Sequence, residues 1–200
     1  MSAAARHVNR TLRWAQRVLF ACGIAALGYC ALVMAQSWYF QREETRNLER
    51  LVVARQTPLA DTSPDSVSVT VHGLIGRIAV ERLGVSVIVM EGTDERTLRR
   101  AAGHITGTAL PGEPGNVGIA AHRDTFFRPL RDIRKDDVIT VTTPGGHFRY
   151  RVISTSIVGP DNVTVLDSDG SDVLTLVTCY PFSFIGPAPN RFIVRAEQIG

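Results

Sequence analysis

The apolar residues of this chain form one long run near the N-terminus and many short runs after residue 70. No residue from Val18 to Gln41 is charged, and most residues from Val18 to Phe40 are apolar. At about 1.5 Å per residue, a helix over 18–40 reaches roughly 34 Å, whereas a bilayer core is about 30 Å thick. The pattern therefore predicts one transmembrane helix over residues 18–40.

The two flanks of this run predict its orientation. Four basic residues and no acid precede it: Arg6, Arg10, Arg13 and Arg17. Segments rich in arginine stay cytoplasmic, and aromatic residues such as the following Trp38-Tyr39 favour the membrane interface. We expect a single-pass protein of the cell membrane, with a cytoplasmic N-terminus and an extracytoplasmic globular part.

A cleaved signal peptide is the alternative interpretation of this segment. Val33-Met34-Ala35 is a passable cleavage site. The apolar part of a signal peptide is usually about 7–15 residues long, and this run is longer. We therefore expect the segment to be retained as an anchor.

Composition divides the chain into four parts: a basic N-terminus over 1–17, the anchor over 18–40, a helical stalk and linker over 41–70, and one globular domain over 71–200. Charged residues surround Leu48, Leu51 and Val52, which predicts a short helix over Gln41–Gln56. The run Asp61–Ser66 has the composition of a linker.

The globular part alternates between short β-branched runs and turn residues. Acids after a candidate N-cap at Thr93-Asp94 predict a helix of about two turns ending at Gly103, and Phe126–Arg131 predicts a helical turn. About eight short strands with turns between them predict a mainly β fold, a closed eight-stranded barrel with one or two short helices. The predicted strands are Ile75–Leu83, Val85–Met90, Asn116–Ala121, Val138–Thr142, His147–Val158, Val163–Leu166, Val173–Thr178 and Phe192–Val194.

Charge argues against a nucleic-acid partner. The chain has 22 Lys and Arg against 19 Asp and Glu. Four of these cations precede the membrane segment, so 18 cations face 19 acids in the rest of the chain, a net charge of about −1. The basic pI reflects membrane topology, and no basic patch interleaved with aromatic residues is present.

Cysteine usage isolates one thiol. Cys22 and Cys30 lie in the membrane segment, where they serve as small apolar residues, so Cys179 has no partner in the exported part. An unpaired thiol in an oxidising compartment is an intermolecular bridge or a reactive group, and a buried structural cysteine is the alternative. No residues have metal-ligand spacing, so we expect neither a metal nor a cofactor.

Three residue types at strand ends together suggest cleavage and re-formation of an amide. Cys179 ends the buried strand Val173–Thr178, His122 ends the strand Asn116–Ala121, and Arg191 opens the last strand. A thiolate can attack a carbonyl, an imidazole can transfer the proton, and a guanidinium can stabilise the oxyanion. Each residue alone has an ordinary structural explanation, such as a local hydrogen bond of the histidine or an ion pair of the arginine.

Three motifs containing these residues resemble the sortases, membrane-anchored cysteine transpeptidases. Thr175-Leu176-Val177-Thr178-Cys179 resembles the strand that ends at the sortase nucleophile. Gly118–Asp124 resembles the strand that bears the family histidine, although Ala121 stands where many members have glycine. Arg191–Ala196 resembles the strand opened by the family arginine, and the neighbouring residues are most similar to class D, with class E next.

The resemblance implies an eight-stranded sortase barrel that cleaves a Leu-Pro-x-Thr-Gly-like sorting signal of exported proteins after threonine. Cys179 is then the nucleophile that forms a thioester, His122 the proton donor and acceptor, and Arg191 the group that binds the oxyanion and substrate. The acyl acceptor is an amine, from a peptidoglycan precursor or a protein lysine.

Three further residues are candidates for the substrate site. Thr178 adjoins the nucleophile, with an ordinary strand threonine as the alternative. His104 competes with His122 for its role, and Asp124 is the acid placed to raise the basicity of His122.

Two alternatives to the transpeptidase remain. A sortase-fold thiol protease acts mainly by hydrolysis, with water as the acceptor. A non-enzymatic, membrane-tethered β-domain uses Cys179 only structurally. Ligation to a supplied amine distinguishes the first alternative, and thiol labelling by a substrate mimic distinguishes the second.

Overall fold

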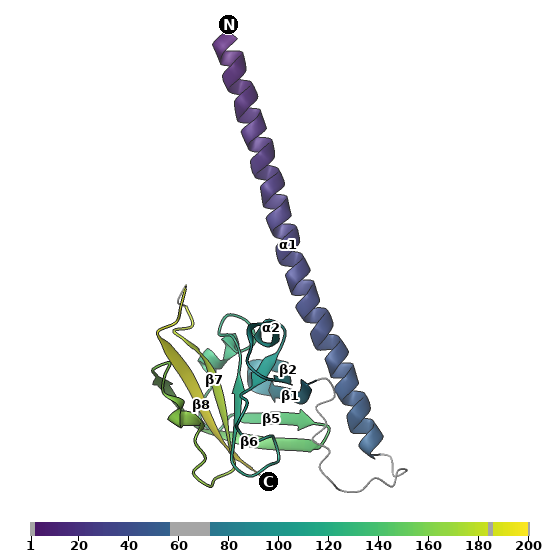
Figure 1. The fold of residues 1–200 in the computed structure, drawn as a ribbon, viewed down its shortest axis with the longest axis vertical. Helices are drawn as coiled ribbons and strands as arrows, with labels where there is room; N and C mark the ends of the chain where they lie inside the picture. Colours follow the sequence, from purple (N-terminus) through teal and green to yellow (C-terminus); the bar gives the residue numbers. More distant parts are fainter. Residues whose placement is uncertain (1–2, 57–72, 184–185, 200) are drawn as a thin grey trace. The chain divides into compact units, whose positions relative to one another are not determined.

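The computed structural model describes residues 3–56, 73–183 and 186–199, which form two compact units (Figure 1). The first unit is Met1–Tyr39, and the second is Phe40–Gly200. The helix α1, Ala3–Gln56, begins in the first unit and ends in the second. Among the described residues, one helical segment, Leu12–Ala54, is long and apolar enough to cross a membrane. The chain therefore has a candidate N-terminal membrane anchor.

The second unit contains a closed barrel of eight strands in the order β1-β2-β3-β4-β7-β8-β6-β5. Two neighbouring pairs, β2/β3 and β4/β7, are parallel, and the other pairs are antiparallel. The predicted mainly β barrel is confirmed. The strands are β1 Leu74–Val80, β2 Val85–Glu91, β3 Ala102–His104, β4 Asn116–Ala120, β5 Val138–Thr143, β6 Gly146–Val158, β7 Val173–Tyr180 and β8 Asn190–Gln198.

The barrel is closed because one face of each strand is apolar and points to a common interior. On β4 and β7, Val117, Ile119, Leu174 and Leu176 are all buried in this core. Side chains alternate between the two faces of a strand, so the residues between them lie on the outer face. This alternation matters for the site, because it fixes which residues at the strand ends point away from the core.

One strand was predicted where the structure has none. Val163–Leu166 is a 3-10 helix, η4, in the connection between β6 and β7. Its β-branched residues favour a strand, but the side chain of Asn116 on β4 donates to the carbonyl oxygens of Val165 and Asp167, at 3.1 and 3.3 Å. These tertiary hydrogen bonds hold the segment against the barrel without a ladder partner, which overrides its β propensity.

A short strand, β3, occupies part of the predicted helix. The helix α2, Glu95–Leu98, is shorter than the predicted two turns, and Asp94 caps it by accepting hydrogen bonds from the amides of Arg96 and Thr97. β3 follows within four residues and pairs in parallel with β2. A Cβ on Gly103 would lie 2.3 Å from the carbonyl oxygen of Gly92. The glycine therefore permits a close backbone approach instead of ending a helix.

The remaining helical segments are short. η2, Glu81–Leu83, joins β1 to β2, and η3, Arg128–Asp132, follows β4. η3 overlaps the helical turn expected over Phe126–Arg131. Phe127 and Leu130 are buried in the barrel core, so this turn covers part of the interior.

The end of α1 packs on the barrel. Leu48 is 1% exposed and contacts the outer face of the barrel in a cluster with Leu74, Ile88 and Ala101. The Gln41 amide bridges two backbone groups, accepting from the Ile88 amide at 2.9 Å and donating to the Arg100 carbonyl at 2.6 Å. The predicted helix within 41–70 is therefore seated on the barrel, while residues 57–72 lie outside the described residues and the four-part division stays a prediction.

Candidate functional site

β7 lies between β4 and β8, and its end carries the predicted nucleophile. Cys179 and Arg191 are directly opposite residues of the antiparallel β7/β8 ladder. Opposite residues of such a ladder have Cβ atoms about 4.5–5.5 Å apart, on the same face of the sheet. The fold therefore places the guanidinium next to the thiol by backbone pairing alone.

His122 lies at the same end of the barrel, on the other side of β7. β4 runs parallel to β7 with Ala120 opposite Val177. The pairing extends one residue past the end of β4, because the Ala121 amide donates to the Val177 carbonyl at 3.2 Å. His122 is the next residue. Cys179 is thus flanked by the chain segment of His122 on one side and by Arg191 on the other.

Strand alternation places these three residues on the outer face of the barrel. Ala121, Leu176 and Val194 point into the core. Counting from these residues, positions 122, 179 and 191 face outward. Each of the three is partly exposed, so the group is reachable from solvent.

The Arg191 guanidinium is held by its own loop. Its Nη1 donates to the carbonyl oxygens of Asn190 at 3.1 Å and Ala188 at 3.4 Å. Among the residues that the structure describes, its Nε and Nη2 have no hydrogen-bond partner. A guanidinium has five N–H donors in a planar fork, so this side chain is oriented and retains donors for a further oxygen atom.

Thr178 lies on the opposite face from Cys179. It is 3% exposed, and its hydroxyl donates to the Ala121 carbonyl at 2.7 Å. The hydroxyl donor is thus engaged by the backbone just before His122. Thr178 therefore ties β7 to the histidine segment, and its contact with substrate stays a prediction.

His104 is buried away from the three strand ends. It is 3% exposed, and its Nδ1 lies 2.7 Å from Oε2 of Glu91. Its Nε2 lies 3.0 Å from the Ala109 carbonyl and 3.1 Å from the Thr108 hydroxyl. Both ring nitrogens are occupied, so His104 links β2, β3 and the following loop and is not available to replace His122.

Asp124 is exposed, two residues after His122. Its carboxylate makes no ion pair with any residue in the described ranges 3–56, 73–183 and 186–199. Its suggested effect on the basicity of His122 therefore has no contact in this structure to support it.

A buried polar pair supports the outer face next to the site. Asn116 is 2% exposed and Thr175 is 0% exposed, and the Thr175 hydroxyl donates to the Asn116 side-chain oxygen at 2.8 Å. The Asn116 amide holds η4, as described above, so the β6–β7 connection is fixed to the sheet. This pair is not among the residues predicted from the sequence, although a polar residue at the start of the buried strand β4 and another inside the buried strand β7 was a detectable signal.

An ion pair holds the same connection farther along. Arg195, on the outer face of β8, donates from Nη2 to Asp169 at 2.7 Å. A hydrogen bond from the Ser171 amide and the charge of Arg195 lower the pKa of Asp169. The β6–β7 connection is therefore attached to β4, β7 and β8, and it borders the face that carries Cys179.

A cavity of about 470 Å³ lies at the other end of β4. Its lining is Gly107–Ala109, Glu113–Asn116 and Leu166–Ser168, and it contains none of the three predicted catalytic residues. Within the part of the chain that the structure describes, no group of three or more His, Cys, Asp or Glu side chains is arranged to hold a metal ion.

Comparison with known proteins connects this geometry to a family. The chain matches the family described as Sortase domain over residues 78–199. It is 31% identical over 125 residues to Sortase D of Bacillus subtilis strain 168, an alignment that covers 62% of this chain and 63% of that relative. The chain therefore spans less than two thirds of that relative's length.

Two solved structures share the fold. The Clostridium perfringens Sortase D5 transpeptidase has a TM-score of 0.66 and 26% identity, covering 81% of this chain and 99% of that one. Sortase C-1 of Actinomyces oris has a TM-score of 0.59 and 29% identity, covering 72% of this chain and 89% of that one. The predicted resemblance to class D is confirmed, and the chain belongs to the sortase family.

Proposed function

We propose that the protein is a membrane-anchored cysteine transpeptidase that cleaves a Leu-Pro-x-Thr-Gly-like sorting signal after threonine. The observation that carries the proposal is the pairing of Cys179 with Arg191 on one side of β7 and the approach of the His122 segment on the other side. Nucleophile, proton carrier and cation then face one surface, as acyl transfer requires. Membership of the sortase family supports the same chemistry.

In the first step, the Cys179 thiolate attacks the carbonyl carbon of the threonine. The carbonyl π electrons move to oxygen, and the free donors of Arg191 stabilise that oxyanion. When the tetrahedral intermediate collapses, the C–N bond breaks and His122 transfers a proton to the leaving amine nitrogen. The products are an acyl thioester on Cys179 and a released peptide with a glycine N-terminus.

In the second step, an amine attacks the thioester carbonyl. His122, now neutral, takes a proton from the attacking nitrogen, and the Cys179 thiolate leaves as the new amide forms. A peptidoglycan precursor or a lysine side chain supplies the amine. The residues need only to hold and transfer one proton in each direction, so no cofactor enters either step.

The N-terminal helix would keep this chemistry at the membrane. The basic residues before it favour a cytoplasmic N-terminus. The barrel then lies outside the cytoplasmic membrane, where exported proteins and envelope precursors meet. Accessibility of a cysteine added in the N-terminal segment, on the two sides of the membrane, tests this orientation.

Dependence on an amine tests the proposed transfer. The full-length protein in detergent is incubated with a fluorescent Leu-Pro-x-Thr-Gly peptide, with and without triglycine. We expect a triglycine-ligated product only with active protein, and no product with Cys179→Ala. Release of hydrolysed peptide alone, at a rate independent of triglycine, would instead support the sortase-fold thiol protease.

A further inference from the structure

The residue after His122 connects the chain segments of the three predicted catalytic groups. The Arg123 guanidinium donates from Nη1 to the Pro181 carbonyl at 3.0 Å and from Nη2 to the Gly186 carbonyl at 2.9 Å. Pro181 comes two residues after Cys179, and Gly186 comes five residues before Arg191. One planar side chain thus bridges two points of the β7–β8 connection from the segment of the histidine.

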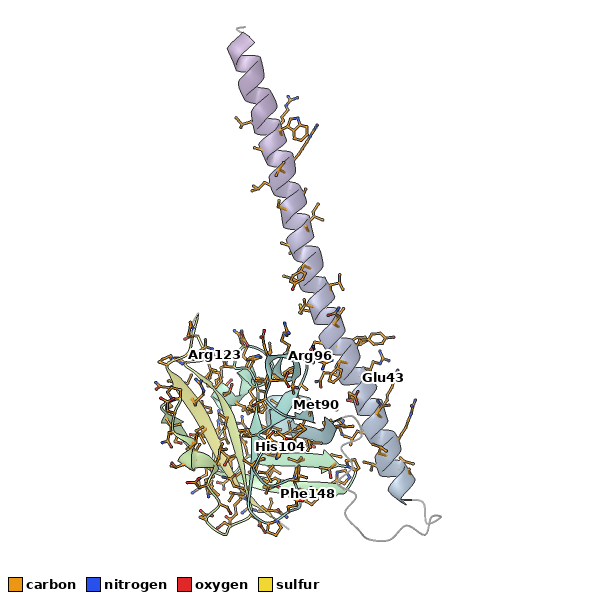
Figure 2. All side chains as sticks on the ribbon, in the orientation of Figure 1. Glu43, Met90, Arg96, His104, Arg123 and Phe148 are labelled. Atoms are coloured by element: carbon orange, nitrogen blue, oxygen red, sulfur yellow. The ribbon has the colours of Figure 1, made fainter. Side chains whose placement is uncertain are left out.

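We propose that Arg123 is a positioning residue, which ties Pro181 and Gly186 to the His122 segment and so keeps Cys179, His122 and Arg191 in register. This inference rests on the proposed function and adds a residue to it. Figure 2 shows Arg123 at the end of the barrel toward which the β7–β8 connection extends.

We call the two hydrogen bonds from Arg123 to Pro181 and Gly186 the Arg123 clamp. The remaining contacts of the connection explain why this clamp matters. Its first part is packed by aromatic contacts, since Phe182 lies edge-on to Phe192 with ring centroids 5.3 Å apart, and Tyr180 stacks on Phe192 at 6.3 Å. In its last part, the Arg191 guanidinium donates to the carbonyl oxygens of Ala188 and Asn190. Arg123 links these two parts across the connection, where the ladder has ended.

The geometry requires an arginine. Two carbonyl groups accept from two different nitrogens of one rigid fork, and a lysine ammonium is a compact point charge that does not reproduce this spacing. Both acceptors lie beyond the last pair of the β7/β8 ladder, Tyr180 and Asn190, so loss of these charge-assisted hydrogen bonds should release the connection without unfolding the barrel. A shift of about 1 Å in a catalytic group can reduce a rate by about a hundredfold.

The test compares Arg123→Lys and Arg123→Ala with Arg128→Ala, an exposed arginine five residues later, in the full-length protein. We expect Arg123→Ala to lower kcat for thioester formation by about 10- to 100-fold with little change in KM. We expect Arg123→Lys to lower kcat nearly as much. Low concentrations of methylguanidinium should partly restore Arg123→Ala and leave the lysine variant unchanged. Arg128→Ala should match the wild type.

Hydrogen exchange separates failure of the clamp from failure of the proposed function. Amides of the connection, in a peptide spanning 180–192, should exchange at least tenfold faster in both Arg123 variants, while β1 and β2 keep their protection. This readout does not need substrate. Equal exchange in the wild type and both variants would overturn the clamp, and so would a Lys variant with full kcat. Unchanged activity of Cys179→Ala would instead overturn the proposed function while leaving the exchange result intact.

Discussion

Cys179 on β7 and Arg191 on β8 are a directly opposed pair in an antiparallel ladder, although they are twelve positions apart in the chain. The relationship is set by backbone register, so it does not depend on a rotamer of either side chain. A register slip of one residue would turn one member of the pair to the other face. Arg123 holds the β7–β8 connection at Pro181 and at Gly186, and these contacts protect the relative position of the thiol and the guanidinium.

Replacing the guanidinium tests this pair. Arg191→Lys keeps the charge but loses the planar fork, and removal of one oxyanion donor typically lowers kcat by about 10²–10³-fold. We expect a loss of at least about 100-fold in single-turnover acylation, with the fold retained. Arg151→Lys, an exposed arginine on β6, is the matched control and should show the wild-type rate. Wild-type acylation by Arg191→Lys would remove the guanidinium from the mechanism.

The Asn116–Thr175 pair tests how the outer face is supported. Thr175→Val keeps the shape of the side chain but leaves the buried Asn116 oxygen without its donor, so we expect a loss of about 1–3 kcal/mol in the free energy of unfolding. Thr175→Ser keeps the hydroxyl and should lose less. Denaturant unfolding of the three proteins measures both values. The opposite order, with valine more stable than serine, would show that the hydrogen bond is not what stabilises this site.

Leu48 tests whether the end of α1 is part of the folded domain. The side chain is 1% exposed, and large-to-small changes at buried leucines typically cost about 2–5 kcal/mol. Leu48→Ala should therefore lower the Tm of the barrel, measured by near-ultraviolet circular dichroism of the full chain in detergent. Val53→Ala on the same helix, where the side chain is 62% exposed, is the control. Equal Tm values for the two variants would mean that α1 does not stabilise the barrel.

Tyr150 predicts an effect at alkaline pH. Burial, with a smaller contribution from the Asp172 charge, raises the pKa of Tyr150 to about 12. Its hydroxyl has no hydrogen-bond partner among the described residues. Because the folded state favours the neutral form, the phenol's contribution is fully present below about pH 10 and is lost as the pH rises from about 10 towards 12.

Tyr150→Phe removes this titration and an unsatisfied hydroxyl. We expect stability at pH 7 equal to or above that of the wild type, and a smaller loss of stability between about pH 10 and 12. Tyrosinate absorbance and thermal unfolding over this range measure the two effects. A variant that is clearly less stable at pH 7, with an unchanged alkaline loss, would show that the Tyr150 hydroxyl has a stabilising partner.

The barrel and its site were predictable from the sequence to different degrees. Short β-branched runs between turn residues indicated the number of strands, yet Val163–Leu166 was wrongly included and Ala102–His104 was missed. In both segments long-range contacts decide the conformation: side-chain bonds from Asn116 hold the first, and the absent side chain of Gly103 lets the second approach Gly92. The pattern of apolar and polar residues within each segment indicates neither of these contacts.

The site showed the same limit. Cys179, His122 and Arg191 were detectable because each lies at a strand end within a motif. Arg123 directly follows the histidine, but the acceptors Pro181 and Gly186 lie 58 and 63 residues away, so these contacts required the fold. His104 also adjoins a glycine and competed with His122 before the motif of Gly118–Asp124 was considered, and the structure adds that His104 is buried against Glu91.

The most direct test of the account is the mass of the protein after a short incubation with a Leu-Pro-x-Thr-Gly peptide and an acid quench. We predict an increase equal to the acyl fragment ending in threonine, located by fragmentation on the peptide that contains Cys179, absent in Cys179→Ala and strongly reduced in His122→Ala. Cleavage of the peptide between threonine and glycine with no acyl group on Cys179, and at an undiminished rate in Cys179→Ala, would contradict it.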